Sequence, residues 1–537
     1  MTDQFSPEER AALSPYFTNL DGPVFALVNL PEVVKGALFA RYSRSPKSLR
    51  RLFLDEFLTD VGRTANRGGV GGSVGPPPAF TDTKRAEELY GRMFLEYGDD
   101  SVAQLGGVHL ACEGASNILT KVLEWGRLAA YLEQSTRYIP YDDLVDGRYR
   151  YHVPRELEGD LRSRYVATLD AMFDTYRELL PVLRQHFSDR FPRDAQTSDA
   201  AYRMSIRAKA LDTLRGLLPA ATTSNVGIYG TGQAYENLML RMRAHPLLEV
   251  RSYADVMLVE LRRVIPAFLR RVDLPDRGGA WSSYLDETRR ATARVAAELL
   301  ADEAATPRDE VTLTDFDPDG EVKVVAAALY AASDVPDDRL LEVAQKMTEG
   351  ERRVVLEAYV GRRTNRRHRP GRAFERTSYR FDVLADYGAF RDLQRHRLLT
   401  LEWQRLSPRH GSVMPEAIVE ARVEDRWHRS LGASAALHDA IAAAGLVEVA
   451  PYAVAMAYRL RFYMEMNARE AMHLIELRSA PQGHPAYRRV AQTMHRLIAE
   501  RAGHRALAAA MTFADHSEVA LERLEAERAA ERRRGGR

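Results

Sequence analysis

The sequence predicts a helix-dominated α+β protein that is built from two pseudo-repeats. Apolar residues recur at helical spacing through most of the chain, most clearly over residues 157–180. Two short runs, 108–111 and 379–384, have the composition of β-strands. Two related segments, 123–142 and 390–411, carry similar polar residues, which indicates an internal duplication.

The length of the chain and its shifts in composition predict its domain organisation. A chain of 537 residues is expected to form two or more domains. We expect a first repeat over 1–275, a linker region over 276–321, a second repeat over 322–520 and a charged tail over 521–537. The tail is expected to be a helix that frays into solvent.

Most of the other elements are expected to be helices. The helix over 157–180 is expected to break or kink at Pro181. The acidic stretch 309–321 has the composition of a linker, and 459–481 is expected to be a single helix. Further helices are expected within 1–60, over most of 82–137, and over 205–218, 235–242, 253–271 and 284–300.

Composition excludes several classes of protein. The net charge is +1, so no overall basic field indicates binding to nucleic acid. A single cysteine, Cys112, excludes a disulfide framework and a thiolate zinc site, and it is typical of a cytoplasmic protein. Cys112 lies in an apolar run, which favours a buried structural thiol over a nucleophile. No signal peptide and no bilayer-spanning apolar run are expected.

Two sequence features are weak evidence for function. Arginine supplies most of the 76 basic residues, so a lone arginine is most often a surface charge. The glycine-rich stretch 68–78 lacks the Gly-Lys-Ser/Thr ending of a phosphate loop. We interpret that stretch as a mobile loop.

The segment 390–411 contains the triplet Arg395-His396-Arg397 at the end of an expected helix. Consecutive helical residues point in different directions, so the three cations cannot all face one partner. The triplet is therefore either a solvated face or part of a site for an anionic ligand. Planar guanidinium groups bind phosphates and electron-rich rings well.

The segment 459–481 carries polar residues in an apolar context. Asn467, Arg469, His473 and Arg478 lie among apolar residues there. Buried polar groups without partners cost several kcal/mol, so these side chains require partners. A bound anion is one candidate partner.

Together these motifs resemble those of the flavin-dependent thymidylate synthases. That family carries an Arg-His-Arg triplet, a Glu-x-Ser-x-Arg-Tyr segment, an Asn-Ala-Arg segment and a final Leu-Arg. The second copy keeps Arg395-His396-Arg397, Asn467-Ala468-Arg469 and Leu477-Arg478. The first copy keeps Glu133, Ser135, Arg137 and Tyr138, and Arg241 matches the Leu-Arg arginine.

Each copy also departs from the family pattern. In the first copy the triplet is Trp125-Gly126-Arg127, and Gly230-Thr231-Gly232 replaces Asn-Ala-Arg. In the second copy the Ser-x-Arg pair comes two residues late, as Ser407 and Arg409, and Asp392 replaces the family's Gln. The losses are largely complementary, so the two copies are expected to form one site together.

The resemblance implies a division of roles among these residues. Arg395, His396, Arg397, Asn467, Arg469 and Glu133 are expected to bind FAD, and Arg478 is the expected catalytic residue. Ser135, Arg137, Arg241, Ser407 and Arg409 are expected to bind dUMP. The implied reaction methylates dUMP to dTMP, with methylenetetrahydrofolate as carbon donor and NADPH as reductant of FAD. The resemblance also implies a homodimer that imitates the family's homotetramer.

Two alternatives remain open at this stage. The missing Gln and the shifted Ser-x-Arg favour a divergent homologue that binds flavin or nucleotide without making dTMP. Alternatively, the arginine-rich stretch 362–372 belongs to a nucleic-acid-binding protein, although the near-neutral charge argues against it. The same stretch could line an entrance for folate or NADPH.

Overall fold

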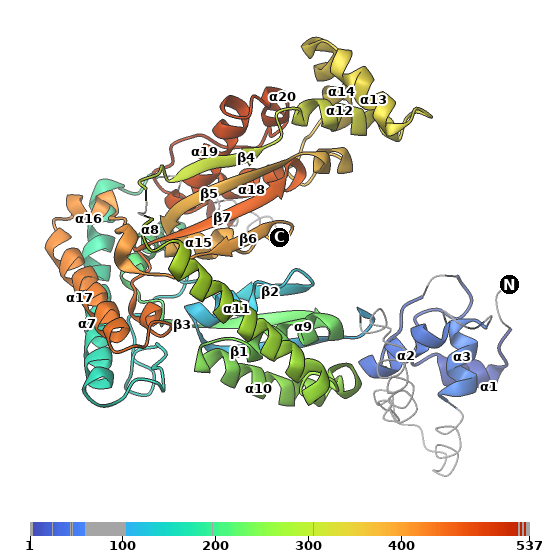
Figure 1. Cartoon of the computed structure of the whole chain (residues 1–537), viewed down its shortest axis with the longest axis horizontal. Coiled ribbons are helices and arrows are strands. Elements are labelled where there is room, and N and C mark those ends of the chain that lie inside the picture. Colours follow the sequence, from blue (N-terminus) through green and yellow to red (C-terminus); the bar gives the residue numbers. More distant parts are fainter. Residues whose placement is uncertain are drawn as a thin grey trace. The chain divides into compact units, whose positions relative to one another are not determined.

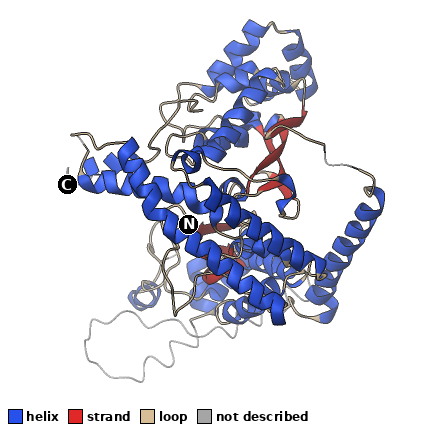
Figure 2. Cartoon of the chain, turned by 90° about the vertical axis from the view of Figure 1, so that its left-hand side faces the viewer, coloured by secondary structure: helices blue, strands red, loops and turns tan. Residues whose placement is uncertain are grey.

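The computed structural model describes residues 4–532 except 24, 43–44, 46, 59–103, 196, 304–305, 525–526 and 529–530. The chain divides into two compact units. Unit 1 comprises 1–113, 128–133 and 225–302, and unit 2 comprises 114–127, 134–224 and 303–537. Helices dominate and strands are few (Figure 2). The glycine-rich stretch 68–78 lies outside the described residues.

Unit 1 combines short N-terminal helices with a small sheet. The sheet has the order β1-β3-β2, and β2 and β3 are antiparallel. Ser6 and Ser48 cap the first turns of α1 and α3 through their side chains, which explains where these helices begin. The elements are α1 (Pro7–Leu13), α2 (Glu32–Tyr42), α3 (Leu49–Glu56), β1 (Gly107–Ser116), β2 (Ala129–Glu133), β3 (Thr223–Thr231), α9 (Gly232–Arg243), α10 (Leu248–Arg262) and α11 (Ala280–Leu299).

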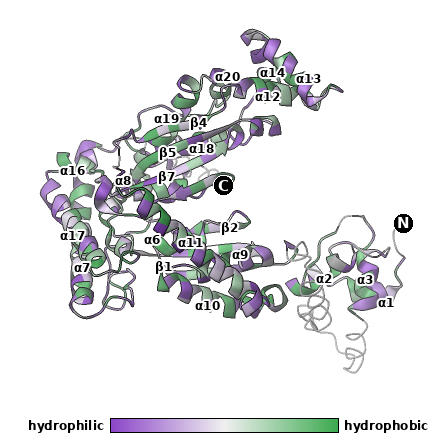
Figure 3. Cartoon of the chain, viewed as in Figure 1, coloured by the Kyte–Doolittle hydropathy of each residue, from purple (hydrophilic) through white to green (hydrophobic). Residues whose placement is uncertain are grey.

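Unit 2 is organised around an antiparallel sheet of order β4-β5-β7-β6 (Figure 1). Along β7, half-buried and buried residues alternate, because successive side chains point to opposite faces of the sheet. The strand accordingly contains both hydrophobic and hydrophilic residues (Figure 3). The strands are β4 (Val311–Phe316), β5 (Ser378–Asp386), β6 (Thr400–Trp403) and β7 (Arg459–Asn467). The longer helices are α7 (Gly159–Arg190), α8 (Asp199–Leu214), α17 (Glu424–Ala443), α18 (Ala468–Arg478) and α19 (Pro485–Glu500). The remaining helices are α6 (Asn117–Leu123), α12 (Gly320–Tyr330), α13 (Asp337–Lys346), α14 (Glu349–Val360), α15 (Tyr387–Leu393), α16 (Glu416–Glu420) and α20 (Arg505–Ala509).

The two halves of the chain repeat one order of elements. A strand, a seven-residue helix and a short strand occur as β1-α6-β2 and again as β5-α15-β6. A long helix follows each time, and then a strand and a helix, β3-α9 and β7-α18. The strand order β1-β3-β2 is repeated as β5-β7-β6. The fold is therefore the predicted helix-dominated α+β class with two pseudo-repeats.

Four sequence expectations are wrong in detail. Residues 459–481 form strand β7 and then helix α18, because the alternation at 459–467 has period two and not a helical period. Helix α7 does not break at Pro181 but continues to Arg190. The helix expected over 253–271 ends at Arg262, and residues 129–133 form strand β2.

The region 276–321 contains regular structure, although we expected a linker there. Helix α11 occupies 280–299, and β4, at 311–316, pairs with β5 as an edge strand. The repeat boundaries at 275 and 322 stay predictions. Among the described residues, no helix has both the length and the apolar character needed to cross a membrane.

The start of the charged tail packs against other parts of unit 2 instead of fraying into solvent. Glu522 is buried and forms an ion pair of 2.5 Å with Lys209. Arg523 is also buried, and its guanidinium lies 3.8 Å from the centre of the Tyr138 ring. Arg528 pairs with Asp194. These ionic contacts, which composition alone does not predict, hold the described part of the tail.

Candidate functional site

Arg137 from the first repeat lies in a buried network. Strand β2 ends at Glu133, and in the following turn the Ser135 hydroxyl accepts a hydrogen bond of 3.2 Å from the Arg137 backbone N–H. The guanidinium of Arg137 binds both carboxylate oxygens of Asp212, at 2.8 and 2.6 Å. It also donates a 2.7 Å hydrogen bond to the hydroxyl of Tyr487, which belongs to the second repeat. The segment Glu-x-Ser-x-Arg thus contacts the other half of the chain.

Arg137 and Asp212 hold each other in their charged forms. Burial alone would lower the pKa of Arg137, but the Asp212 carboxylate outweighs it and the pKa is raised. Burial alone would raise the pKa of Asp212, and Arg137 keeps it below its ordinary value. A buried bidentate pair of this kind is rigid and geometrically specific.

A second buried carboxylate, Asp392, connects further arginines. Arg215, just after α8, places Nη1 at 3.2 Å from Asp392 Oδ2 and Nη2 at 3.8 Å from Asp386. Arg395 Nη1 lies 3.8 Å from Asp392 Oδ1. Burial would raise the pKa of Asp392, but Arg395 and Arg215 hold it well below its usual range. Asp392, which replaces the family's Gln, is therefore a buried anion between two arginines.

The three residues of the triplet have different environments. Helix α15 ends at Leu393, so the triplet lies in the turn between α15 and β6. Arg395 is half-buried, His396 is buried and Arg397 is exposed. This agrees with the expectation that three consecutive cations cannot share one partner.

His396 connects Arg478 to a buried carboxylate. Its Nδ1 lies 2.9 Å from Glu470 Oε1, and its Nε2 accepts a 3.0 Å hydrogen bond from Arg478 Nε. Burial lowers the pKa of His396 to about 4 although Glu470 opposes the shift, so the ring is neutral near pH 7. Both ring nitrogens are therefore engaged by protein groups.

Arg478 is a cation without a carboxylate partner. In the described part of the chain, its one hydrogen bond goes to His396 and it forms no ion pair. Its guanidinium lies 5.5 Å from the centre of the Tyr487 ring, the ring whose hydroxyl binds Arg137. Burial lowers the pKa of Arg478 although Asp392 opposes the shift. A half-buried guanidinium with so few protein contacts is suited to bind an anionic ligand.

Arginines and aspartates described above, with one tyrosine, form a group that we call the arginine cluster. It comprises Arg137, Asp212, Arg215, Asp392, Arg395, Arg478 and Tyr487. These residues come from both repeats, and all of them belong to unit 2.

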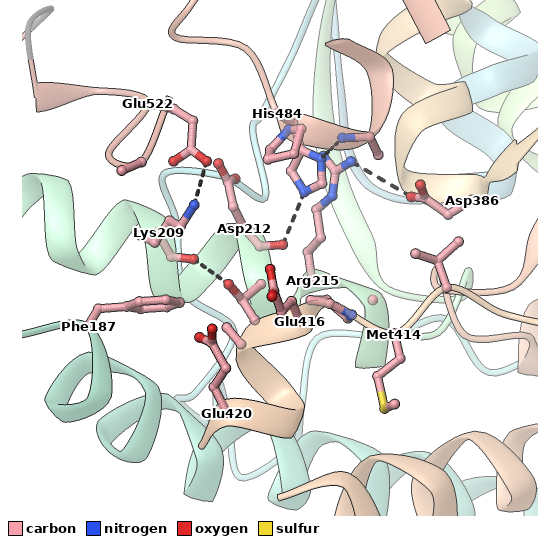
Figure 4. A pocket seen from close by; sticks show the side chains of 18 of the residues that line it. Phe187, Lys209, Asp212, Arg215, Asp386, Met414, Glu416, Glu420, His484 and Glu522 are labelled. Carbon is pink, nitrogen blue, oxygen red and sulfur yellow. Dashed lines mark hydrogen bonds and ion pairs between the residues drawn. The ribbon is translucent and has the colours of Figure 1, made fainter. Parts of the chain in front are cut away.

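A cavity of about 720 Å³ adjoins the cluster. Asp212 and Arg215 line it (Figure 4). His484 lies beside them, with Nε2 at 3.2 Å from the Asp212 backbone oxygen, and Phe187 and Met414 add apolar surface. The volume is in the range of small-molecule sites.

The other residues implied by the resemblance have various environments. Asn467 caps α18, because its Oδ1 accepts a 2.9 Å hydrogen bond from the Glu470 backbone N–H. Arg469 donates to the Pro370 backbone oxygen at 2.9 Å. Ser407 is half-buried beside the 3-10 turn Pro408–His410, and Arg409 within that turn is exposed. Glu133 in β2 and Arg241 in α9 belong to unit 1.

The helix caps align the copies differently from the sequence comparison. Thr231 caps α9 as Asn467 caps α18. Counting from these caps, Arg241 stands where the second copy has Leu477, one residue before the position of Arg478. The match of Arg241 to the Leu-Arg arginine is thus offset by one residue.

The arginine-rich stretch 362–372 contains one clearly structural arginine. Arg363 binds both oxygens of the buried Glu476 at 2.6 Å, so this side chain is unsuited to bind nucleic acid. Cys112 is buried as expected, and burial raises the pKa of its thiol to about 11.

Sequence reasoning missed Asp212, Arg215, Glu470 and Tyr487. Asp212 and Arg215 stand three residues apart in an otherwise apolar run, which is a readable signal of buried charges that pair with other groups. Glu470 directly follows the Asn-Ala-Arg segment and precedes the Leu-Arg pair. Its position between these two motifs is the signal that could have found it. Tyr487 has no signal in the sequence, because only the fold brings it to Arg137.

The neutral state of His396 predicts a pH dependence of stability. Between about pH 4 and its ordinary value of 6.5, unfolded His396 binds a proton that the folded residue does not. Acidification through this window should therefore lower the free energy of unfolding, and His396→Gln should reduce the dependence. His484 and His245, whose pKa values burial also lowers, contribute the remainder. The pKa values of Asp212, Asp392 and Glu470 are also lowered in the folded protein. Their effect on the free energy of unfolding appears only when the pH falls below the ordinary pKa values of these carboxyl groups. Urea unfolding midpoints at several pH values measure this, and equal slopes in both proteins would contradict it.

Comparison with known proteins identifies a family. The profile of the family described as "Thymidylate synthase complementing protein" matches residues 73–267 and 312–502. A UPF0159 protein of Chlamydia muridarum is 38% identical over 526 residues, covering 97% of this chain and 98% of its own length. A UPF0159 protein of Thermoplasma acidophilum is 30% identical over 520 residues, covering 92% and 97%.

More distant similarities cover single parts of the chain. A flavin-dependent thymidylate synthase of Mycobacterium marinum is 29% identical over 213 residues, 39% of this chain and 76% of that protein. Among solved structures, the UMP/dUMP methylase PolB of Streptomyces cacaoi, bound with 5-Br dUMP, is 21% identical at a TM-score of 0.30. It covers 37% of this chain and 94% of that one.

Proposed function

Because the chain belongs to the thymidylate synthase complementing, or flavin-dependent thymidylate synthase, family, we propose that it methylates dUMP to dTMP. Methylenetetrahydrofolate would supply the carbon, and NADPH would reduce the FAD. The observation that carries the proposal is the environment of Arg478. Its guanidinium is half-buried, has no carboxylate partner among the described residues, and lies beside the pair Arg137–Asp212 of the other repeat.

Charge supports a nucleotide as the ligand. A nucleoside monophosphate carries a phosphate that arginine binds bidentately and a pyrimidine ring whose negative charge arginine can stabilise. Arg478 offers its two Nη atoms for such contacts. The cavity that Asp212 and Arg215 line, and Arg478 does not, has room for a further small ligand such as part of a folate.

Only some of the residues that the resemblance implies for FAD have side chains available to bind it. Arg397 is exposed and Arg395 half-buried, so both can reach a diphosphate. His396 and Asn467 instead use their ring nitrogens and Oδ1 within the protein. A bound flavin would supply the hydride, and the protein groups would bind and orient it.

We propose one such site in each chain. At the corresponding position of the first copy, Trp125 replaces the first arginine of the triplet. Its Nε1 donates to the Leu401 backbone oxygen at 3.3 Å, and its ring packs edge-on against Trp403. Arg127 donates to the Thr400 hydroxyl. These contacts occupy the first copy's version of the flavin clamp. The homodimer, the pseudo-tetramer and the cytoplasmic location remain part of this proposal.

A second candidate is a family member that binds flavin or nucleotide without making dTMP. Asp392 favours it, because a buried carboxylate between Arg215 and Arg395 neutralises charge that a substrate could otherwise use. Complementation of a thymidine auxotroph, together with a direct dTMP assay, separates the two candidates. Flavin-loaded protein that makes no dTMP would favour the second candidate.

Replacing Arg397 with Ala is expected to reduce FAD retention strongly, because an exposed guanidinium that can pair with the diphosphate is lost. The absorbance of flavin in the purified protein measures the loss. Arg353→Ala is the matched control, since Arg353 is an exposed helix-surface arginine of the same unit. Normal flavin occupancy in Arg397→Ala would refute the carried-over role.

A further inference from the structure

Three side chains form a hydrogen-bonded chain at the arginine cluster. Glu470 Oε1 lies 2.9 Å from His396 Nδ1, and Arg478 Nε donates to His396 Nε2 at 3.0 Å. A neutral imidazole has one donor and one acceptor nitrogen. Since Nε2 accepts from Arg478, Nδ1 carries the proton and donates it to Glu470. The carboxylate therefore fixes the tautomer that Arg478 requires.

We propose that Glu470 and His396 are positioning residues for Arg478, an inference that rests on the proposed role of Arg478 at the pyrimidine nucleotide. Held through Nε, the guanidinium keeps Nη1 and Nη2 directed to the ligand. This assigns His396 to the orientation of a substrate arginine, in place of a hydrogen bond to FAD.

The first members of this chain are held firmly. His396 is 7% exposed and Glu470 is 4% exposed. Glu470 lies in the first turn of α18, where its backbone N–H is bound by Asn467. Hydrogen bonds from His396 and His473 hold the pKa of Glu470 at about 2 although burial opposes this shift, so it stays a carboxylate. A buried carboxylate on the first turn of a capped helix can hold a ring in one orientation.

The same groups could in principle bind a metal ion. His396, Glu470 and His473 present potential ligand atoms within 4.8 Å of one another. However, a metal would need the Nδ1 lone pair of His396, and that nitrogen carries the proton in the observed hydrogen-bond pattern. The Arg478 cation, 3.0 Å from the same ring, also opposes a second positive charge. The geometry therefore favours the hydrogen-bonded chain.

Substitutions at His396 separate positioning from flavin binding. His396→Phe removes the acceptor for Arg478 and is expected to lower kcat for dTMP formation about ten- to hundredfold, with FAD occupancy retained. His396→Gln offers an amide oxygen near Nε2 and should recover part of this loss. His428→Phe is the matched control, because His428 is an exposed histidine of helix α17 in the same unit, and its kcat should stay within about twofold of the parent. Loss of FAD in both His396 variants, or equal effects of His396→Phe and His428→Phe, would overturn the proposal.

A second measurement does not depend on activity. Nitrogen-15 NMR of the labelled full chain reports the histidine tautomers, and His396→Gln identifies the signals of His396. We expect the Nδ1–H tautomer at pH 7, and Glu470→Ala should abolish that preference. An Nε2–H tautomer, or zinc that co-purifies at one ion per chain and is lost in His396→Gln, would overturn the proposal. If the expected tautomer is found but no dTMP is made, the proposed function fails and the hydrogen-bonded chain stands.

Discussion

Replacing Arg137 with Ala is expected to weaken dUMP binding at least tenfold and to lower the free energy of unfolding by about 3–5 kcal/mol. The stability loss follows because Asp212, buried and bound through both oxygens, would be left without its partner. The binding loss follows because the first repeat would no longer supply its cation to the cluster. Isothermal titration with dUMP and urea unfolding measure the two effects.

A double variant separates the two effects of Arg137. Arg137→Ala combined with Asp212→Ala removes the unpaired carboxylate and should regain part of the lost stability. It should not regain dUMP affinity, since the cation is still missing. If Arg137→Ala keeps its dUMP affinity, the pair is structural only and the division of the site between the repeats is wrong.

Replacing Arg478 with Ala is expected to lower turnover by about 100- to 1000-fold, the range seen when a preorganised charge-stabilising donor is removed. Stability should change little, because Arg478 forms one hydrogen bond and no ion pair among the described residues. Turnover and thermal unfolding are measured on the same preparations.

Two further variants make the Arg478 result specific. Arg478→Lys should recover little, because lysine has no planar fork for the ligand and no Nε–H fixed by His396. Arg353→Ala, at an exposed surface arginine, should behave as the parent protein does. Turnover above one tenth of the parent in Arg478→Ala would remove Arg478 from the catalytic role.

The sequence predicted the class of fold and the pairing of the two copies better than it predicted individual elements. The segment 459–467 shows why, since Arg-Leu-Arg-Phe-Tyr-Met-Glu-Met-Asn alternates with period two but is followed at once by a helix. Reading both parts with one period hid strand β7, the strand between β5 and β6. A single helix over 459–481 would also put Asn467 inside the helix, whereas Asn467 is the cap at which helix α18 begins.

The motifs pointed to part of the arginine cluster, and long-range contacts complete it. Arg137, Arg395, His396 and Arg478 were singled out by their resemblance to family motifs, and the structure brings them together in unit 2. Asp212 and Tyr487 complete the network from positions 75 and 350 residues away from Arg137 along the chain. A local pattern does not contain such partners, because the fold alone brings them close.

The central claim is that the two repeats of one chain together form one nucleotide site. Co-expression of Arg137→Ala chains with Arg478→Ala chains tests it, with dTMP formation measured on the purified mixture. If each site forms within a chain, every site carries one defect and the mixture should turn over no faster than the more active of the two variants. If sites form between two chains of a dimer, random mixing restores about a quarter of the parent's turnover, and that result would contradict the account.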